Sequence, residues 1–309
     1  MFLKKYRTVV LPAVVVLAVV TLSILPAGCG GQDTSGRLKV SASIVPLADF
    51  CSRVGGEHVE VQCLVPPGAG CGHTFEPTPG SMDFLSKAGV FVENGLGLES
   101  WATDVLSKIT RPDVVRVVAA EAVPADLLLP SVEGEPGLED PHVWLDPSLA
   151  VYQVEAIREG LVEADPSNAE VYQRNAAAYI EELKGLDGEL RRELEQVKGA
   201  SFISTHPTWT YFAPHFGLVQ VGEVEELPGK EPSARRIAEL MEKVKEFDVK
   251  AVFAEPQLSP RALEIITKDA GPGVKVATVD PVGDPDNPEV SDYIKMMRFD
   301  VGVMSEALE

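Results

Sequence analysis

Basic residues are few in this chain of 309 residues: Lys and Arg together number 27 against 47 Asp and Glu, giving a formal net charge of −20. Binding to the phosphates of a nucleic acid needs clustered Lys and Arg, so this balance argues against a nucleic-acid partner. The acidic surface repels anionic lipid headgroups and mainly keeps the protein soluble. The length, with 45% hydrophobic residues, allows two domains that each have a core.

Cysteine is also scarce, with four residues in the chain. Cys29 lies near the N-terminus, and Cys51, Cys63 and Cys71 follow it. The C-x₂-C spacing of thiolate zinc sites is absent, so we do not expect a metal site built on cysteine. In an exported protein the three later cysteines can form one disulfide and leave one thiol, and the sequence does not decide which pair forms.

The N-terminal segment has the parts of a secretory signal. Basic residues up to Arg7 precede an apolar run from Val9 to Leu25, and Ala27-Gly28-Cys29 follows it. Small residues before a Cys resemble the cleavage site of bacterial lipoproteins, although Pro26 stands where that pattern prefers Leu. We therefore expect a signal peptide at 1–28 and, at 29–37, a flexible tether that begins with lipidated Cys29. The alternative is an uncleaved transmembrane helix, because the run approaches the roughly 20 residues needed to span a bilayer.

From Leu38 onward, short apolar strands alternate with helical patterns, which is typical of parallel βα units. The pattern predicts an N-terminal lobe at 38–164 and a C-terminal lobe at 200–309. We expect strands at 38–44, 59–65, 90–93, 114–118, 201–204, 218–221, 251–254 and 274–279. We expect helices near 47–54, 81–87, 98–109, 147–163, 209–216, 233–247, 260–268 and 289–308.

Residues 165–199, between the two lobes, predict one long helix. Asp165-Pro166 and the pair Ser167 and Glu170 are helix-start signals, and no proline follows before Val197. Apolar residues recur at helical spacing: Val171, Tyr172, Ala176, Tyr179, Ile180, Leu183, Leu186, Leu190 and Leu194. About thirty helical residues form a rod of roughly 45 Å, which suits a rigid connector between domains.

Histidine occurs five times, and three of the five share one setting. Each lies in a turn or loop where we place the carboxyl end of a strand: His73, His142 and His206. Asp280 closes the strand expected at 274–279. Ligands of open α/β sheets bind outside these strand ends, and imidazoles with one carboxylate suit tetrahedral zinc. His58 and His215 lack this setting, and we expect both to be ordinary residues without a role in binding.

Two segments carry a resemblance to a known family. The first is Pro66-Pro67-Gly68 followed by His73-Thr74-Phe75-Glu76-Pro77, and the second is Asp140-Pro141-His142-Val143-Trp144-Leu145-Asp146-Pro147. They resemble the two metal-ligand motifs of the zinc and manganese substrate-binding proteins of ABC importers, the TroA-like family. The resemblance continues through Asn94-Gly95-Leu96, Phe253-Ala254-Glu255-Pro256-Gln257 and Asp280-Pro281. It implies two βα lobes with mostly parallel sheets, joined by one long rigid helix, with the metal in the cleft between the lobes.

The resemblance also implies a set of ligands. His73 and His142 match the first two positions, His206 the third and Asp280 the fourth, with Glu255 outside the ligands. Zinc-type members tend to have His at the third position and manganese-type members a carboxylate, so Zn²⁺ is the expected cargo and Mn²⁺ the alternative. Two departures stand out. The loop before His73 is one residue longer and contains Cys71, and the acidic stretch 122–140 contains no His, although zinc-type members often carry a His-rich acidic loop there.

The implied function is capture rather than catalysis. We expect a monomer that is anchored to the outer side of the bacterial cell membrane by lipid at Cys29. It would bind a divalent transition metal and deliver it to the membrane permease of an ABC importer. Manganese or iron as cargo, and a role as a surface adhesin, are alternatives. A zinc hydrolase is not expected, because catalytic zinc keeps one position open for water and the H-E-x-x-H motif is absent.

Overall fold

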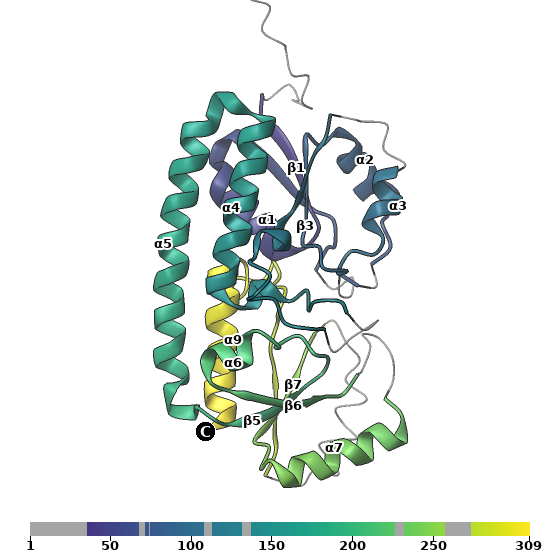
Figure 1. The fold of residues 1–309 in the computed structure, drawn as a ribbon, viewed down its shortest axis with the longest axis vertical. Helices are drawn as coiled ribbons and strands as arrows, with labels where there is room; N and C mark the ends of the chain where they lie inside the picture. Colours follow the sequence, from purple (N-terminus) through teal and green to yellow (C-terminus); the bar gives the residue numbers. More distant parts are fainter. Residues whose placement is uncertain are drawn as a thin grey trace, which may run out of the picture.

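The structure is a computed structural model that describes residues 36–67, 72–73, 75–107, 113–131, 137–225, 232–256 and 273–309. The expected signal peptide at 1–28, Cys29, Cys71 and the helix expected at 260–268 lie outside these residues. Within them, two four-stranded sheets stand one above the other beside a group of long helices (Figure 1). None of the helices in this part of the chain combines the length and apolarity needed to cross a membrane.

The N-terminal lobe contains a parallel sheet with the strand order β2-β1-β3-β4. Its strands are β1 (Leu38–Ala42), β2 (Val59–Cys63), β3 (Val90–Glu93) and β4 (Val115–Val118). Successive side chains of a strand point to opposite faces, so Val90 and Val92 enter one core while Phe91 enters another. Helices α1 (Val45–Gly55) and α4 (Pro147–Ala164) cover the first face, and α2 (Pro79–Lys87) and α3 (Ala102–Ser107) the second (Figure 1).

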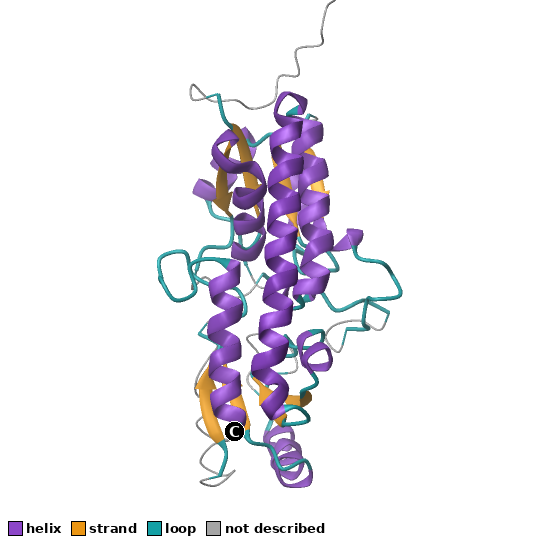
Figure 2. Ribbon diagram, turned by 90° about the vertical axis from the view of Figure 1, so that its left-hand side faces the viewer, coloured by secondary structure: helices purple, strands orange, loops and turns teal. Residues whose placement is uncertain are grey.

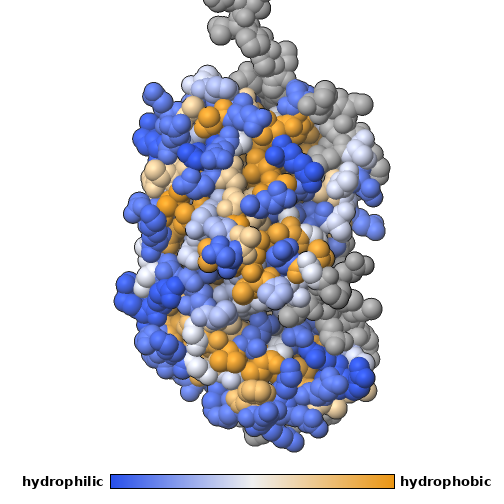
Figure 3. Space-filling view, in the orientation of Figure 1, coloured by the Kyte–Doolittle hydropathy of each residue, from blue (hydrophilic) through white to orange (hydrophobic). Residues whose placement is uncertain are grey.

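The C-terminal lobe repeats this arrangement with the strand order β6-β5-β7-β8, again parallel. Its strands are β5 (Ser201–Ser204), β6 (Val219–Glu223), β7 (Ala251–Ala254) and β8 (Lys275–Thr278). Phe202 and Phe253 enter the large core, while Ile203 and Val252 enter a smaller core under α7 (Ala234–Glu246). Hydrophilic side chains cover most of the end of the molecule where α7 lies (Figure 3).

One long helix, α5 (Ala169–Leu194, 26 residues), joins the two lobes. Its buried residues are Tyr172, Ala176, Tyr179, Ile180, Leu183, Leu186, Leu190 and Leu194, the expected set without Val171. The helix packs against α1 and α4 in the N-terminal lobe and against the last helix, α9 (Tyr293–Leu308), in the C-terminal lobe (Figure 2). The predicted fold class, two parallel βα lobes joined by one long helix, is confirmed.

Local sequence sets where the helices begin. Thr78, Asp146, Ser233 and Asp292 each accept a hydrogen bond from a backbone N–H in the first turn of a helix, which stabilises the helix at that residue. The last helix therefore starts at Tyr293 and not at 289. Helix α3 starts at Ala102, later than the expected 98, because residues 95–97 have positive φ and form a left-handed turn.

The two described cysteines of the N-terminal lobe, Cys51 and Cys63, are free thiols. Burial raises the pKa of both groups, and that of Cys63 rises to about 12. Both thiols are therefore protonated at neutral pH in the metal-free protein. The pairing left open by the sequence is therefore not Cys51 with Cys63 in this structure.

Candidate metal centre

Three imidazole rings converge where the two lobes meet. The ring centroids of His73 and His142 are 5.5 Å apart, and those of His142 and His206 are 5.3 Å apart. His73 lies in the turn that follows β2, His142 lies just before the turn Val143–Leu145 that leads into α4, and His206 follows β5. Three residues that are far apart in sequence thus share one small volume, although only His206 follows a strand directly and His142 lies in a loop rather than at the expected strand end.

The rings border a cavity of about 20 Å³, which is room for about one water-sized particle. Both lobes contribute to its wall, with polar groups from His73, His142, His206, Thr208 and Glu255 and apolar groups that include Ile44, Trp144 and Pro281. The volume is too small for an organic ligand and sufficient for one ion. Several imidazoles around a space of this size are a typical donor set for a transition metal.

Two of the three rings each have a carboxylate beside their Nδ1 nitrogen. Oδ1 of Asp140 lies 2.9 Å from Nδ1 of His142, and Oε1 of Glu255 lies 2.9 Å from Nδ1 of His206. A carboxylate in this position accepts the Nδ1–H, fixes the orientation of the ring and leaves Nε2 as the basic nitrogen. The hydroxyl of Thr208 lies 2.7 Å from Nε2 of His206, so a cation on this nitrogen would replace that contact.

His73 is held in its neutral form by its surroundings. Burial lowers its pKa to about 3, with further contributions from His142 and His206. A protonated imidazole cannot bind a metal, whereas a neutral one can. At neutral pH this ring therefore needs no deprotonation before it can bind a cation.

Asp280 adjoins the cavity without lining it. It follows β8, and its neighbours Pro281 and Val282 belong to the wall. Its Oδ1 accepts the backbone N–H groups of Val282 and Gly283, at 3.3 and 3.0 Å, and its own backbone N–H donates to Oδ1 of Asp300 at 2.7 Å.

A second carboxyl group, that of Asp300, lies beside Asp280. Asp300 is fully buried, and this burial raises its pKa well above the usual range, as do the charges of Asp280 and Glu255. Carboxyl groups gathered in this way are stabilised by a proton or by a cation. The C-terminal side of the cavity therefore favours a positive guest.

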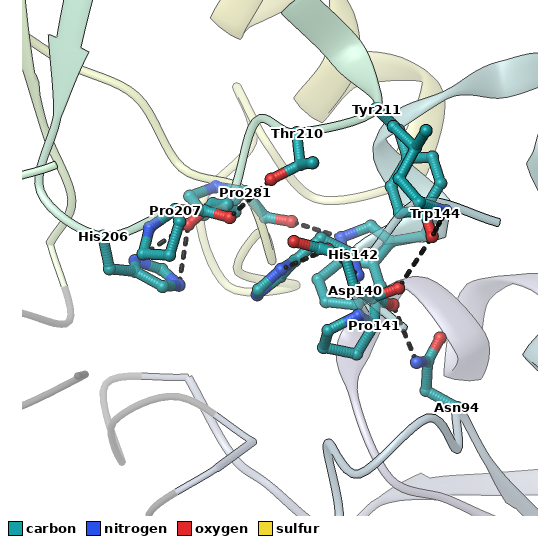
Figure 4. A network of polar contacts seen from close by, with 12 residues as sticks. Asn94, Asp140, Pro141, His142, Trp144, His206, Pro207, Thr210, Tyr211 and Pro281 are labelled. Atoms are coloured by element: carbon teal, nitrogen blue, oxygen red, sulfur yellow. Dashed lines mark hydrogen bonds and ion pairs between the residues drawn. The ribbon is translucent and has the colours of Figure 1, made fainter. Parts of the chain in front are cut away.

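The segment that carries His142 is fastened from both lobes (Figure 4). The side-chain amide of Asn94 donates to the carbonyl oxygen of Pro141 at 2.9 Å, from within the N-terminal lobe. The hydroxyl of Tyr211, from the C-terminal lobe, donates to the carbonyl oxygen of Asp140 at 2.9 Å. The position of His142 is thus set before any ligand binds.

Glu99 is a supporting residue that sequence analysis missed. Its carboxylate accepts hydrogen bonds from the hydroxyl of Ser43 at 2.6 Å and from the backbone N–H groups of Asn94 and Gly95 at 2.8 and 2.9 Å. Burial raises its pKa to about 7 although these bonds oppose the rise. Glu99 thereby fixes the turn from which Asn94 reaches Pro141. In the sequence, the only sign of this role is that Glu99 follows Gly95 by four residues, which is close enough for its side chain to reach the turn.

His215, which we expected to be an ordinary residue, belongs to a second cluster of metal-type side chains. Ligand atoms of Asp146, Asp187 and His215 lie within 4.8 Å of one another. The imidazole side chain is only 12% exposed, with Nδ1 2.8 Å from Asp146 and Nε2 2.5 Å from Asp187. Sequence reasoning missed this cluster because its three members are distant in sequence. His58, by contrast, is partly exposed and contacts Tyr172 edge-on.

Comparison with known proteins places the chain among metal-binding components of import systems. The family model described as zinc-uptake complex component A, periplasmic (ZnuA), matches residues 40–307. The manganese-binding lipoprotein MntA of Halalkalibacterium halodurans is 30% identical over 297 residues, covering 94% of this chain and 96% of MntA. The zinc-binding lipoprotein AdcA of Streptococcus pneumoniae serotype 4 is 31% identical over 297 residues, covering 91% of this chain and 58% of AdcA.

Solved structures show the same similarity. A crystal structure of ZnuA is 32% identical, with a TM-score of 0.76 over 88% of this chain and 100% of the other. The periplasmic zinc-binding protein TroA from Treponema pallidum is 23% identical, with a TM-score of 0.80 over 88% of this chain and 99% of the other. At that identity the second match shows the fold alone. It agrees with the two-lobed architecture and the long connecting helix.

Proposed function

This chain belongs to the family of ZnuA-type metal-binding components, and from that premise we propose that its cargo is zinc, held by His73, His142, His206 and Asp280. The coarser role follows from the family: the chain is a non-catalytic protein that binds a divalent metal for ABC import. The observation that carries the proposal is the convergence of three imidazoles on a cavity of about 20 Å³.

The proposed ligands supply three nitrogens and one carboxylate. Zinc accepts imidazole nitrogen and carboxylate oxygen in tetrahedral sites. Asp140 and Glu255 would act from outside the ligands, by holding His142 and His206 through their Nδ1 atoms. Four protein ligands would leave no open position for a substrate water, in keeping with transport rather than catalysis.

Manganese is the second candidate, and the carboxyl groups favour it. Glu255, Asp280 and Asp300 lie together on one side of the cavity, and hard ions such as Mn²⁺ prefer oxygen donors. The name of MntA points the same way, and the name of AdcA points to zinc. We favour zinc for two reasons. Three of the four proposed ligands are imidazoles, and a given site generally binds zinc more tightly than manganese.

Delivery completes the proposed role. The metal-loaded protein would present its cargo to the membrane permease of an ABC importer, while lipid on Cys29 keeps it at the outer side of the cell membrane. The names of MntA and AdcA, both lipoproteins, support the anchor. Cys29 itself lies outside the described residues.

The test is the metal content and stoichiometry of the protein. Protein purified without added metal should contain zinc by elemental analysis. After stripping with a chelator it should bind one equivalent of zinc tightly, and manganese more weakly in competition. Absence of tight binding by any divalent metal would overturn the proposed function, and tighter manganese than zinc binding would overturn the choice of cargo.

A further inference from the structure

His215 lies between two carboxylates that belong to other parts of the fold. It is on α6 (Phe212–Phe216) of the C-terminal lobe. Its Nδ1 lies 2.8 Å from Oδ2 of Asp146, the residue that caps α4 of the N-terminal lobe, and its Nε2 lies 2.5 Å from Oδ1 of Asp187 in α5. One imidazole thus connects both lobes and the helix that joins them.

The charged groups around this ring balance only when it is protonated. Arg191 of α5 donates to Oδ2 of Asp187 at 2.9 Å and to the carbonyl oxygen of His215 at 2.9 Å, and its Nη2 lies 2.7 Å from Nε2 of His215. From α9, Tyr293 faces the two carboxylates, and burial together with their charges raises its pKa well above the usual range. Two carboxylates and one guanidinium leave one negative charge, which an imidazolium neutralises.

The directions of the pKa shifts agree with this charge state. Burial alone would lower the pKa of His215, but the hydrogen bonds and charges of Asp146 and Asp187 outweigh burial and raise it. Burial would raise the pKa of Asp187, and the bonds from His215 and Arg191 lower it instead. A neutral imidazole has one N–H and can serve one carboxylate only. Carboxylate oxygens at hydrogen-bond distance from both ring nitrogens therefore fit an imidazolium that donates to Asp146 and to Asp187.

Asp146 connects this cluster to the candidate metal centre. Its Oδ1 accepts the backbone N–H and the hydroxyl of Ser148, at 2.8 and 2.7 Å, which fixes the start of α4. Its Oδ2 is the atom that faces His215. Its backbone N–H donates to the carbonyl oxygen of Val143 at 3.2 Å and closes the short turn that begins after His142. Movement of Asp146 would therefore move the turn that carries His142.

We propose that His215 is a positioning residue that holds Asp146, and with it the turn carrying His142, against α5 and the C-terminal lobe. The proposal rests on the proposed metal site, because His142 is its point of action. His215 has a raised pKa in the folded protein, so its contribution is fully present below the unfolded value of about 6.5 and is lost as pH rises through the folded value.

The experiment compares wild type with His215→Gln, and uses His58→Gln as the matched control in the N-terminal lobe. Zinc affinity is measured by competition with a chelator between pH 6.5 and 9.5, and Tm is measured on the metal-free proteins over the same range. At pH 6.5 we expect His215→Gln to bind one equivalent of zinc at least about fivefold more weakly than wild type. Both its affinity deficit and its Tm deficit should shrink as pH rises, and His58→Gln should match wild type throughout.

Two results would overturn the proposal. Equal zinc affinity of wild type and His215→Gln, or a deficit that does not change with pH, would show that His215 does not position the site as an imidazolium. Loss of a second tight equivalent of zinc in the variant would make the cluster a cation site instead. If His215→Gln does not fold, Asp187→Asn tests the same contact from α5, with a smaller deficit in the same direction. Failure of wild type to bind any metal is distinguishable, because it overturns the proposed function itself.

Discussion

The indole nitrogen of Trp144 donates a hydrogen bond of 2.7 Å to the carbonyl oxygen of Pro281, across 137 positions of sequence. Trp144 lies two residues after His142, and Pro281 follows Asp280 directly. The bond therefore ties together two loops that carry proposed ligands, one from each lobe (Figure 4). The hydroxyl of Tyr293 adds a bond of 2.6 Å to the carbonyl oxygen of Trp144. The two halves of the site are thus held close without any help from metal.

Removal of the charge on the two supporting carboxylates should weaken zinc binding. Glu255→Gln and Asp140→Asn keep an oxygen for the Nδ1–H of His206 and His142 but lower the basicity of each ring. We expect each variant to lose about tenfold in zinc affinity while it still binds one equivalent. Chelator competition measures this, with Glu246→Gln at the exposed end of α7 as control. Affinities equal to the control would mean that these carboxylates do not act on the ligands.

His206→Glu should shift the balance between the two candidate metals. The change replaces a nitrogen donor by a hard oxygen donor and places a second carboxylate beside Glu255, which now lies 2.9 Å from the ring. We expect zinc affinity to fall at least tenfold, about 1.4 kcal/mol, and manganese affinity to fall less or to rise.

The measurement for this variant is competition of each metal against a chelator of known affinity. His58→Ala is the control, because His58 lies in the turn before β2 and not at a carboxyl end of a strand. The structure makes His215 unsuitable for this purpose, since it contacts Asp146 and Asp187. Unchanged zinc affinity in His206→Glu would remove His206 from the ligands and the choice of zinc with it.

Glu99 should make stability depend on pH in a particular direction. Its folded pKa of about 7 exceeds the unfolded value of about 4.3, so its favourable contribution is present at low pH and is lost as pH rises through about 7. Glu99→Gln cannot ionise, but its amide would face the N–H of Gly95 and destabilise the turn at every pH. The Tm deficit of the variant should therefore narrow between pH 5 and pH 8.

Thermal unfolding of the metal-free proteins at four pH values tests this, with exposed Glu57→Gln as control. The control variant should follow wild type over the whole range. A deficit of constant size in Glu99→Gln would contradict the raised pKa, although the hydrogen bonds to Ser43, Asn94 and Gly95 would still account for the loss of stability.

Cys29→Ala should release the protein from the membrane. The thiol of Cys29 is the proposed point of lipid attachment. Without a lipid, the acidic surface of the mature chain repels the anionic headgroups of the membrane. Fractionation of cells followed by detection of the protein measures the change. A variant that still sediments with membranes would favour an uncleaved N-terminal helix over a lipid anchor.

Periodicity in the sequence was sufficient to predict most of the fold. All eight expected strands are present, because parallel strands that are covered on both faces show as short apolar runs such as Val90–Glu93. The spacing of apolar residues in α5 likewise predicted its buried face, because a helix that packs against both lobes along one side carries its apolar residues on that side. The strand-end rule holds for His206, which follows β5 directly, because parallel strands end at one edge of a sheet. His142 reaches the same place from the loop that leads into α4, with no strand of the described residues before it.

What sequence could not predict depends on distances between elements. His215 meets Asp146 and Asp187 only because α6 packs against α5 near the start of α4, and no local pattern encodes that crossing. Glu99 falls within the helix expected near 98–109, and no local pattern predicts its hydrogen bonds to the backbone of Asn94 and Gly95. Asp280 shows the limit of the strand-end rule, which locates a residue at the edge of the sheet but does not decide whether its side chain lines the cavity.

The last helix closes the structure of the first lobe. Tyr293, at the start of α9, packs against Phe50 of α1 with ring centroids 4.9 Å apart, and its backbone N–H donates to Asp49 of α1 at 3.2 Å. A chain that leaves the ribosome or crosses a membrane with its N-terminus first would present α1 long before Tyr293 arrives. Part of the apolar surface of the N-terminal lobe would stay exposed until nearly the whole chain had emerged. The order of synthesis thus makes completion of this part of the core a late event.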